Sequence, residues 1–374
     1  MDVLQLIRQA SSMHAADLQL VVGSPPLVRI YGLLQPMDNF KTLTPSDIEE
    51  AFAQLTTEQE KSSFEKEMEL DFGYSIPDVV RVRCNAARQL NGMSLVLRLF
   101  PPKIPSIDEL GLPEIYKNLV QEPRGLVLVC GPTDSGKSTT LAAMIRHLYT
   151  QGAHHVITVE DPIEYIHTEV VGAITQRQLG VHTTSYAHAL KHILRQNPDV
   201  IMVGEIRDYE TAASVLSLAE AGHLVLSTGH APSAPQAIER IVDMFPLNER
   251  YLSQTRLASL LVAVLCQTLV PRSNGSGRIA AVEIMINNTP VSSLIREGKI
   301  HQLPNIIRTN HEAGMITLDE ALVNLYKKGV ITYQTALAYC EDAGEVGKLV
   351  EGPEKGKKYK SAVAAPAKRR TTTE

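Results

Sequence analysis

The stretch LVLVCGPTDSGKS at residues 126–138 decides the fold. It carries the pattern G-x-x-x-x-G-K-[ST] from Gly131 to Ser138, directly after an apolar run and before a predicted helix over 139–149. The glycines let the backbone curl, so that its N–H groups converge on a phosphate at the N-terminus of the helix. The stretch therefore predicts a phosphate-binding loop at the edge of an α/β sheet.

The loop indicates ATP with Mg²⁺ as its ligands. Lys137 supplies a positive charge to the β- and γ-phosphates and is also a candidate catalytic residue, and the Ser138 hydroxyl is placed to ligate Mg²⁺. Asp134 is unusual here because a carboxylate repels phosphate, but aspartate tolerates turn conformations, so we expect altered affinity and retained function. The candidate nucleotide-binding residues are Gly131, Thr133, Asp134, Ser135, Gly136, Lys137, Ser138 and Thr139.

The chain around the loop alternates short apolar strands with helices. Runs that are apolar on both faces are typical of a parallel sheet covered by helices, so we expect an α/β domain here. We place the apolar run 260–265 in a helical pattern that Gln267 breaks, and we expect mostly helices over 291–343. The predicted strands are 126–130, 156–159, 200–203, 224–226 and 279–285.

Two further strands end in carboxylates. The run DVIMVGE ends in Glu205, and VEDPIE, which follows a strand, ends in Glu164. Each acid taken alone is more often a helix cap or a surface charge, but two such strand ends in one phosphate-loop domain favour a function. We therefore expect Glu205 and Glu164 to position or activate water, and Ser138, Glu164 and Glu205 to be the metal ligands.

The segment STGH, ending in His230, follows the next strand. A polar cluster at the carboxyl end of a parallel strand suits a sensor of the γ-phosphate, and histidine can donate a hydrogen bond to phosphate or to bound water. A lone histidine is more often structural. Its place beside the phosphate loop makes His230 a catalytic candidate.

The N-terminal residues 1–100 suggest a smaller α+β domain, with strands over 17–22, 27–31, 71–74, 79–85 and 93–100. Val80, Val82 and Cys84 alternate with Arg81 and Arg83 along one strand. The arginines, with Arg98, form either an exposed polar sheet face or a phosphate-contacting group. The predicted divisions are 1–100, a proline-rich linker at 101–107, the ATPase domain with C-terminal helices at 108–344, and a basic disordered tail at 345–374.

Composition bounds the remaining function classes. The net charge of -5 argues weakly against a dedicated nucleic-acid binder. The four cysteines include no C-x-x-C pair, so we expect no zinc site, no disulfide framework and a reducing cytoplasm. The sequence also lacks an apolar run long enough to cross a bilayer and a signal peptide, so we expect membrane association through a partner alone.

Together the motifs resemble the secretion ATPase superfamily, and most closely the type IV pilus retraction ATPases of the PilT and PilU family. The resemblance covers about residues 1–340. It is carried by GPTDSGKSTTLAAMI, ITVEDPIEYIH, LRQNPDVIMVGEIRDYET, AEAGHLVLSTGHA, ERIVDMFP, and the terminal segments ADLQL, GSPPLVRI, RVRCNAARQ, LIREGKIHQL and GMITLDEALVNLYKKGVI.

The resemblance implies a PAS-like N-terminal domain, a RecA-like ATPase domain and a ring of six copies. In this family the nucleotide lies at a subunit interface, so Arg81, Arg83 and Arg98 are expected to complete a site in trans. Glu205 matches the catalytic glutamate. Glu164 matches the family's Asp box and His230 its His box. Rotation between the domains about the linker would convert hydrolysis into movement, through docking to an inner-membrane pilus platform protein.

Three alternatives remain beside retraction. A pilus or secretion assembly ATPase shares the core but usually carries a tetracysteine element and a long extra N-terminal region. A nucleic-acid-driven RecA-like motor is disfavoured by the acidic balance and the absence of interleaved basic and aromatic residues. A regulatory subunit of low turnover is suggested by Asp134, which replaces a glycine, and by Gly229, which replaces a leucine of the family pattern.

Overall fold

The computed structural model describes residues 1–168 and 171–351. Most of the basic tail predicted over 345–374, from residue 352 onward, lies outside the described residues. The predicted start of the disordered tail at 345 is wrong, because residues 345–351 belong to helix α14 (Ala343–Glu351), whose Val346 is fully buried. Within the described ranges, every helix is too short or too polar to span a lipid bilayer.

The N-terminal part forms a six-stranded antiparallel sheet in the order β3-β2-β1-β6-β5-β4. Along β5 the buried side chains of Val80, Val82 and Cys84 alternate with Arg81 and Arg83, as predicted, and the buried row faces the core. The strands are β1 (Asp17–Val21), β2 (Leu27–Ile30), β3 (Leu33–Pro36), β4 (Glu69–Ile76), β5 (Val80–Gln89) and β6 (Gly92–Phe100).

Three helices complete this part: α1 (Val3–Ser12), α2 (Pro45–Leu55) and α3 (Glu58–Glu67). Thr44 caps α2 and Thr57 caps α3, each in a reciprocal capping box with an acid three residues later. The apolar faces of all three helices share one core with β1, β5 and β6. The arginine-bearing face of β5 is thereby left free to meet the rest of the chain.

The second sheet has seven strands in the order β13-β12-β7-β11-β10-β8-β9. All neighbours are parallel except β12 and β13, which form a long antiparallel hairpin. The strands are β7 (Gly125–Cys130), β8 (His154–Glu160), β9 (Gly172–Gln178), β10 (Val200–Val203), β11 (Leu224–Gly229), β12 (Leu261–Pro271) and β13 (Arg278–Ile286). The phosphate loop follows β7, the strand between β12 and β11.

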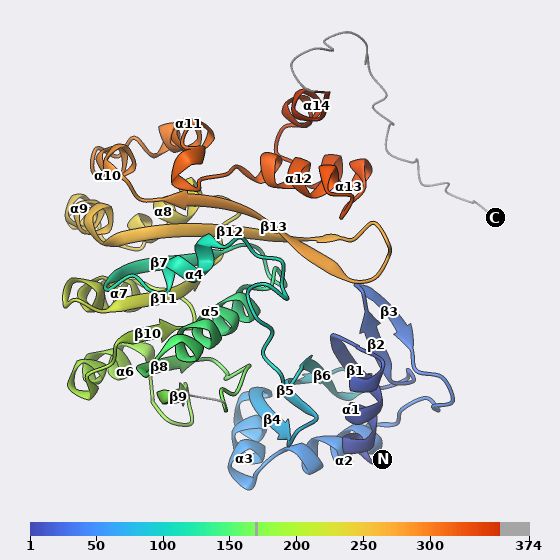
Figure 1. Ribbon diagram of the computed structural model, residues 1–374. Helices are drawn as coiled ribbons and strands as arrows, with labels where there is room; N and C mark the ends of the chain where they lie inside the picture. Colours follow the sequence, from blue (N-terminus) through green and yellow to red (C-terminus); the bar gives the residue numbers. More distant parts are fainter. Residues whose placement is uncertain (169–170, 352–374) are drawn as a thin grey trace.

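Helices cover both faces of this sheet (Figure 1). One face packs α4 (Ile115–Leu119) and α5 (Lys137–Gln151). The other face packs α6 (Tyr186–Ile193), α7 (Tyr209–Glu220), α8 (Ala234–Asp243), α9 (Arg250–Leu260), α10 (Thr289–Arg296) and α11 (Leu303–Thr309). Helices α12 (Leu318–Lys327) and α13 (Tyr333–Tyr339) pack with α14 over the far end of the hairpin.

The helical assignment of residues 260–265 is wrong from Leu261 onward. Helix α9 ends at Leu260, and Leu261 begins β12, which pairs with β7. An apolar run carries no period, so its pattern does not separate a buried strand from a buried helix. Strands β3 and β9 were also not predicted.

The linker joins the two sheets by packing on α5. Phe100 and Ile104 are buried against Ala142 and Tyr165, and Nη1 of Arg146 donates a 2.8 Å hydrogen bond to the Ile104 carbonyl. This contact holds the N-terminal sheet beside the phosphate loop.

Candidate active site

The phosphate loop needs glycine at two positions. Gly131 has φ 144°, and a Cβ there would lie 2.3 Å from the carbonyl oxygen of Gln267. Gly136 has φ 86° and stands as the N-cap of α5, where its Cβ would lie 3.1 Å from Nε2 of the same glutamine. The loop is therefore packed directly against β12, and side chains would push it away from that strand.

Gln267 holds the loop, although it was not predicted as a site residue. Its Nε2 donates a 2.6 Å hydrogen bond to the Ser135 carbonyl, and its Oε1 accepts a 3.0 Å bond from the Thr140 hydroxyl. The side chain is buried, so both bonds are shielded from water. A polar residue inside an apolar run, where a strand crosses behind the loop, was the signal available in the sequence.

Lys137 closes the loop on itself. Its Nζ donates to the carbonyls of Gly131 at 3.0 Å and Pro132 at 2.8 Å. Burial lowers the pKa of this lysine, while Glu205 and other nearby carboxylates act in the opposite direction. The Ser135 hydroxyl is buried and has no hydrogen-bond partner among the described residues. The Lys137 ammonium and the Ser135 hydroxyl are thus both available as hydrogen-bond donors to an anion in the loop.

Glu205 lies two residues after the end of β10 and is held between the side chains of Arg207 and His230. Its Oε2 accepts a 2.7 Å bond from Nε of Arg207, and its Oε1 lies 3.1 Å from Nε2 of His230. Nη1 of Arg207 also lies 3.6 Å from Asp161. Burial lowers the pKa of His230, and the charge of Lys137 acts in the same direction. Arg207 was not predicted, although it stands two residues after the glutamate.

His230 reaches this position from the end of β11. Gly229, the residue before it, has room for little else, because a Cβ there would lie 3.1 Å from Sγ of Cys130. A leucine at 229 would require this cysteine to move. Glycine at 229, in place of the leucine of the family pattern, therefore allows β11 to pack closely against Cys130 of the neighbouring strand β7.

The end of β8 supplies a second acidic group. Glu160 is buried, which raises its pKa to about 7, against hydrogen bonds from Thr158 at 2.6 Å and Gln176 at 3.2 Å. Glu164 lies beyond it, and its Oε1 is 3.4 Å from Nη1 of Arg83. This ion pair joins the two sheets.

The three predicted arginines have different surroundings. Arg83 and Arg98 line the same cavity as Lys137, and Nε of Arg98 also donates a 3.1 Å bond to Asp17. Arg81 does not line it, because its Nε donates to the Ile163 carbonyl at 3.0 Å and its Nη1 to Ser75. Their action on a neighbouring copy stays a prediction.

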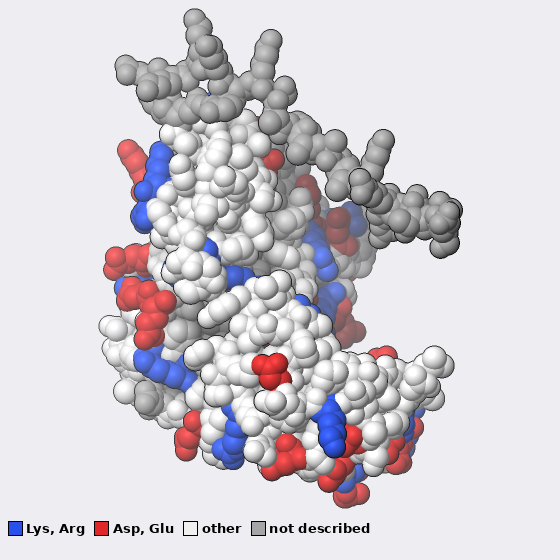
Figure 2. All heavy atoms as spheres, turned by 90° about the vertical axis from the view of Figure 1, so that its right-hand side faces the viewer, with Lys and Arg blue, Asp and Glu red and all other residues white. Residues whose placement is uncertain are grey.

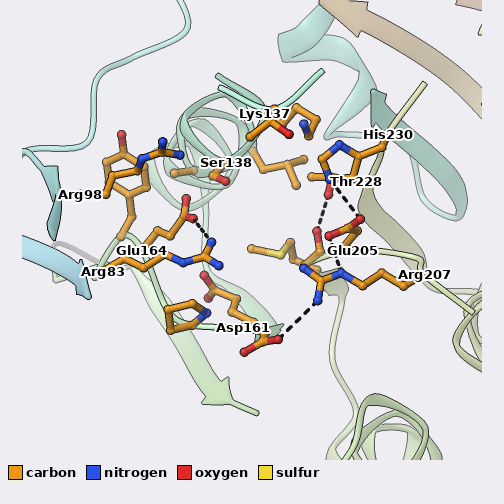
Figure 3. A pocket seen from close by; sticks show the side chains of 18 of the residues that line it. Arg83, Arg98, Lys137, Ser138, Asp161, Glu164, Glu205, Arg207, Thr228 and His230 are labelled. Carbon is orange, nitrogen blue, oxygen red and sulfur yellow. Dashed lines mark hydrogen bonds and ion pairs between the residues drawn. The ribbon is translucent and has the colours of Figure 1, made fainter. Parts of the chain in front are cut away.

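These side chains surround a cavity of about 280 Å³ between the sheets (Figure 3). In this view Arg83 extends toward Glu164, and Glu205 lies between His230 and Arg207. Of the predicted residues, the lining includes Thr133, Asp134, Lys137, Ser138, Glu164, Glu205, His230, Arg83 and Arg98. Ser135 and Gly131 are buried in the loop, while Gly136 and Thr139 line a second cavity beside it.

The residues present fit a magnesium nucleotide. The N-terminus of α5, Lys137 and the unpaired Ser135 hydroxyl suit phosphate, while Ser138, Glu164 and Glu205 offer the oxygen ligands that Mg²⁺ prefers. The described residues contain no group of three or more histidine, cysteine or acidic side chains placed to hold a metal alone.

Comparisons with known proteins agree with this geometry. Residues 65–297 match the family model described as type II/IV secretion system protein. The chain is 40% identical to the type IV pilus retractation ATPase PilT of Pseudomonas aeruginosa, over 90% of this chain and 97% of that protein. It is 39% identical to the type IV pilus ATPase PilU of the same organism, over 94% and 92%.

A solved structure is similar over nearly the whole chain. The crystal structure of the pilus retraction motor PilT with bound ADP matches with a TM-score of 0.82 and 38% identity, over 93% of this chain and 99% of that one. Fold, phosphate loop and relatives thus point the same way. The chain belongs to the type II/IV secretion system protein family, in the branch that contains PilT and PilU, and it is an ATP-hydrolysing enzyme.

Proposed function

We propose that this ATPase works as a ring of six copies that powers type IV pilus retraction, docked at the inner membrane through a pilus platform protein. The observation that carries the proposal is the convergence of Lys137, Glu205 and Glu164 with Arg83 and Arg98 in one cavity between two sheets. The likeness to PilT over 97% of its length supports retraction.

The proposed domains follow the two sheets. Residues 1–100 form the PAS-like N-terminal domain, 101–107 the linker, and 108–351 the motor domain with its C-terminal helices, α14 included. Two sheets that are joined by one short linker and meet at the cavity support this division. A nucleotide bound there touches both domains, so its arrival and departure change how they pack.

Nucleotide binding exchanges partners within the loop. Lys137 leaves the carbonyls of Gly131 and Pro132 and donates to the β- and γ-phosphates, where the N-terminus of α5 also favours negative charge. Ser138, Glu164 and Glu205 would hold Mg²⁺. When bound, this ion would neutralise negative charge that develops during phosphoryl transfer.

Glu205 orients and deprotonates the attacking water. Arg207 and His230 fix its carboxylate from two sides, so that it is already aimed when the substrate arrives. His230, which follows β11, contacts this carboxylate. It would sense the γ-phosphate and transmit its presence to the boundary between the two domains. Arg83 and Arg98 stabilise the charge on the transferring phosphoryl group.

The binding and hydrolysis steps are tested on the purified full chain. Wild type should bind ATP with Mg²⁺ and hydrolyse it, and Lys137→Ala should lose both. Unchanged turnover in that variant would remove the phosphate loop from the mechanism. Hydrolysis that requires added DNA or RNA would favour the nucleic-acid-driven motor. A wild-type turnover rate no higher than that of a Glu205→Ala variant would favour a regulatory subunit.

Retraction is tested in the native host by deleting the coding sequence and scoring surface pili and twitching motility. Excess pili without motility would support retraction, and missing pili would point to an assembly motor. Re-expression of wild type should restore motility. Re-expression of Glu205→Gln should not, which separates loss of hydrolysis from loss of the protein.

A further inference from the structure

Asp134 lies inside the phosphate loop in a conformation that favours glycine. Its φ is 63°, in the left-handed region, which aspartate enters more readily than most residues with side chains. Its side chain lines the same cavity as Lys137 and Ser138. The loop therefore carries a fixed negative charge where a phosphate-binding loop normally presents backbone alone.

This carboxylate is paired with Arg278, the first residue of β13. Its Oδ2 accepts a 2.8 Å bond from Nη1 of the arginine, although the two residues are 144 positions apart. The backbone at Arg278 is fixed in turn by the hairpin. Its carbonyl accepts a bond from Nε of Arg272, and the N–H of Arg272 donates to Gly277. A turn of set geometry thus presents the guanidinium to the loop.

The charge of Asp134 reaches the groups that would bind phosphate. Burial lowers the pKa of Lys137, and the carboxylate of Asp134 is among the charges that oppose this lowering. An unpaired carboxylate that lines the same cavity as Lys137 would repel each added phosphate charge. A paired one presents a nearly neutral group, because the opposite charge lies within hydrogen-bond distance.

We propose that Arg278 is a positioning residue for nucleotide binding: it neutralises the phosphate-loop carboxylate of Asp134 and holds it away from the bound phosphates. This inference rests on the proposed nucleotide site. The arginine acts through Asp134, so it should matter only while position 134 is charged. Because Arg278 also lines a second cavity beside Gly136 and Thr139, direct contact with the nucleotide is the alternative to be separated.

A double-mutant cycle makes that separation. Binding of ADP and of a non-hydrolysable ATP analogue is measured with Mg²⁺ for wild type, Arg278→Gln, Asp134→Asn and the double variant. Asparagine keeps the shape and the left-handed conformation of residue 134 while removing its charge. We expect Arg278→Gln alone to weaken binding of the ATP analogue by about tenfold. The loss should be smaller for ADP and should shrink with added salt.

The same substitution in the Asp134→Asn background should change binding by less than about twofold. An equal loss in both backgrounds would overturn the proposal and assign Arg278 to direct contact. No loss in either background would overturn it as well. Arg278→Lys should retain most of the affinity, and a thermal melt of each variant checks folding. Failure of wild type itself to bind nucleotide would instead contradict the proposed function.

Discussion

Nη1 of Arg83 lies 3.4 Å from Oε1 of Glu164, and this ion pair bridges the N-terminal sheet and the nucleotide-binding sheet across the cavity. Both side chains are partly buried, with 33% and 15% of their surfaces exposed. A bound nucleotide can compete for this contact, since phosphate attracts the guanidinium and Mg²⁺ attracts the carboxylate. We therefore expect this pair to couple nucleotide binding in the proposed site to the packing of the two sheets.

The substitution Arg83→Gln should lower the ATP turnover rate by at least about 100-fold while leaving ADP binding within a few-fold of wild type. The reason is that the guanidinium stabilises charge that develops on the phosphoryl group. Steady-state hydrolysis and ADP titration measure the two effects. Arg88→Gln is the matched control, because Arg88 stands on the same strand but lies over the Phe64 ring, away from the cavity. Equal turnover in both variants would contradict the role.

Glu205→Gln should reduce turnover by about 100- to 1,000-fold with ATP binding retained. Glutamine keeps the size of the side chain but accepts no proton from water. Glu210→Gln, an exposed acid at the start of α7, should hydrolyse ATP at the wild-type rate. Single-turnover hydrolysis and equilibrium binding distinguish a lost proton acceptor from lost affinity, and a variant that hydrolyses normally would remove Glu205 from the chemistry.

Gln267→Leu should destabilise the protein by about 1–3 kcal/mol and weaken nucleotide binding, because it leaves the Ser135 carbonyl and the Thr140 hydroxyl buried without their partner. Thr140→Val removes one of the two bonds and should cost less. Chemical denaturation and nucleotide titration report the two effects. A Gln267→Leu variant with an unchanged denaturation midpoint would show that the strand does not hold the loop.

Glu283 on β13 predicts a pH dependence of stability. Burial raises its pKa to about 7, opposed by a hydrogen bond from the Ala234 N–H and reinforced by the charges of Glu341, between α13 and α14, and Asp319 of α12. The raised value means that the folded state holds the proton up to about pH 7, whereas the unfolded state loses it near its ordinary value. This carboxyl therefore lowers the free energy of unfolding as the pH rises, by on the order of 3 kcal/mol between pH 4 and a pH above 7.

The substitution Glu283→Gln removes this titration. The gain in melting temperature over wild type should be larger at pH 8 than at pH 5, as measured by thermal denaturation at both values. A gain that is the same at both would show that the carboxyl is not protonated in the folded protein.

The sequence predicts the strands and acidic residues of the site better than the side chains that hold those residues in place. The strands β8 and β10 were predicted from their apolar runs, and Glu164 and Glu205 were predicted as site residues because acids that follow parallel strands converge at one edge of the sheet. Gln267 and Arg207 were missed because their importance depends on a neighbour in space. Arg81 was grouped with Arg83 by alternation, which fixes the face of a strand but not the distance a side chain reaches.

The bond from Gln267 to the Ser135 carbonyl spans 132 residues of sequence, and it has a consequence for synthesis on the ribosome. The phosphate loop leaves the exit tunnel early, but the strand that shapes it is translated much later. A nascent chain that ends before this strand carries the whole motif without the hydrogen bonds that set its curvature. We therefore expect the loop to reach its full affinity for ATP only after β12 has docked. Bound nucleotide would then stabilise the completed domain and not its early folding intermediates.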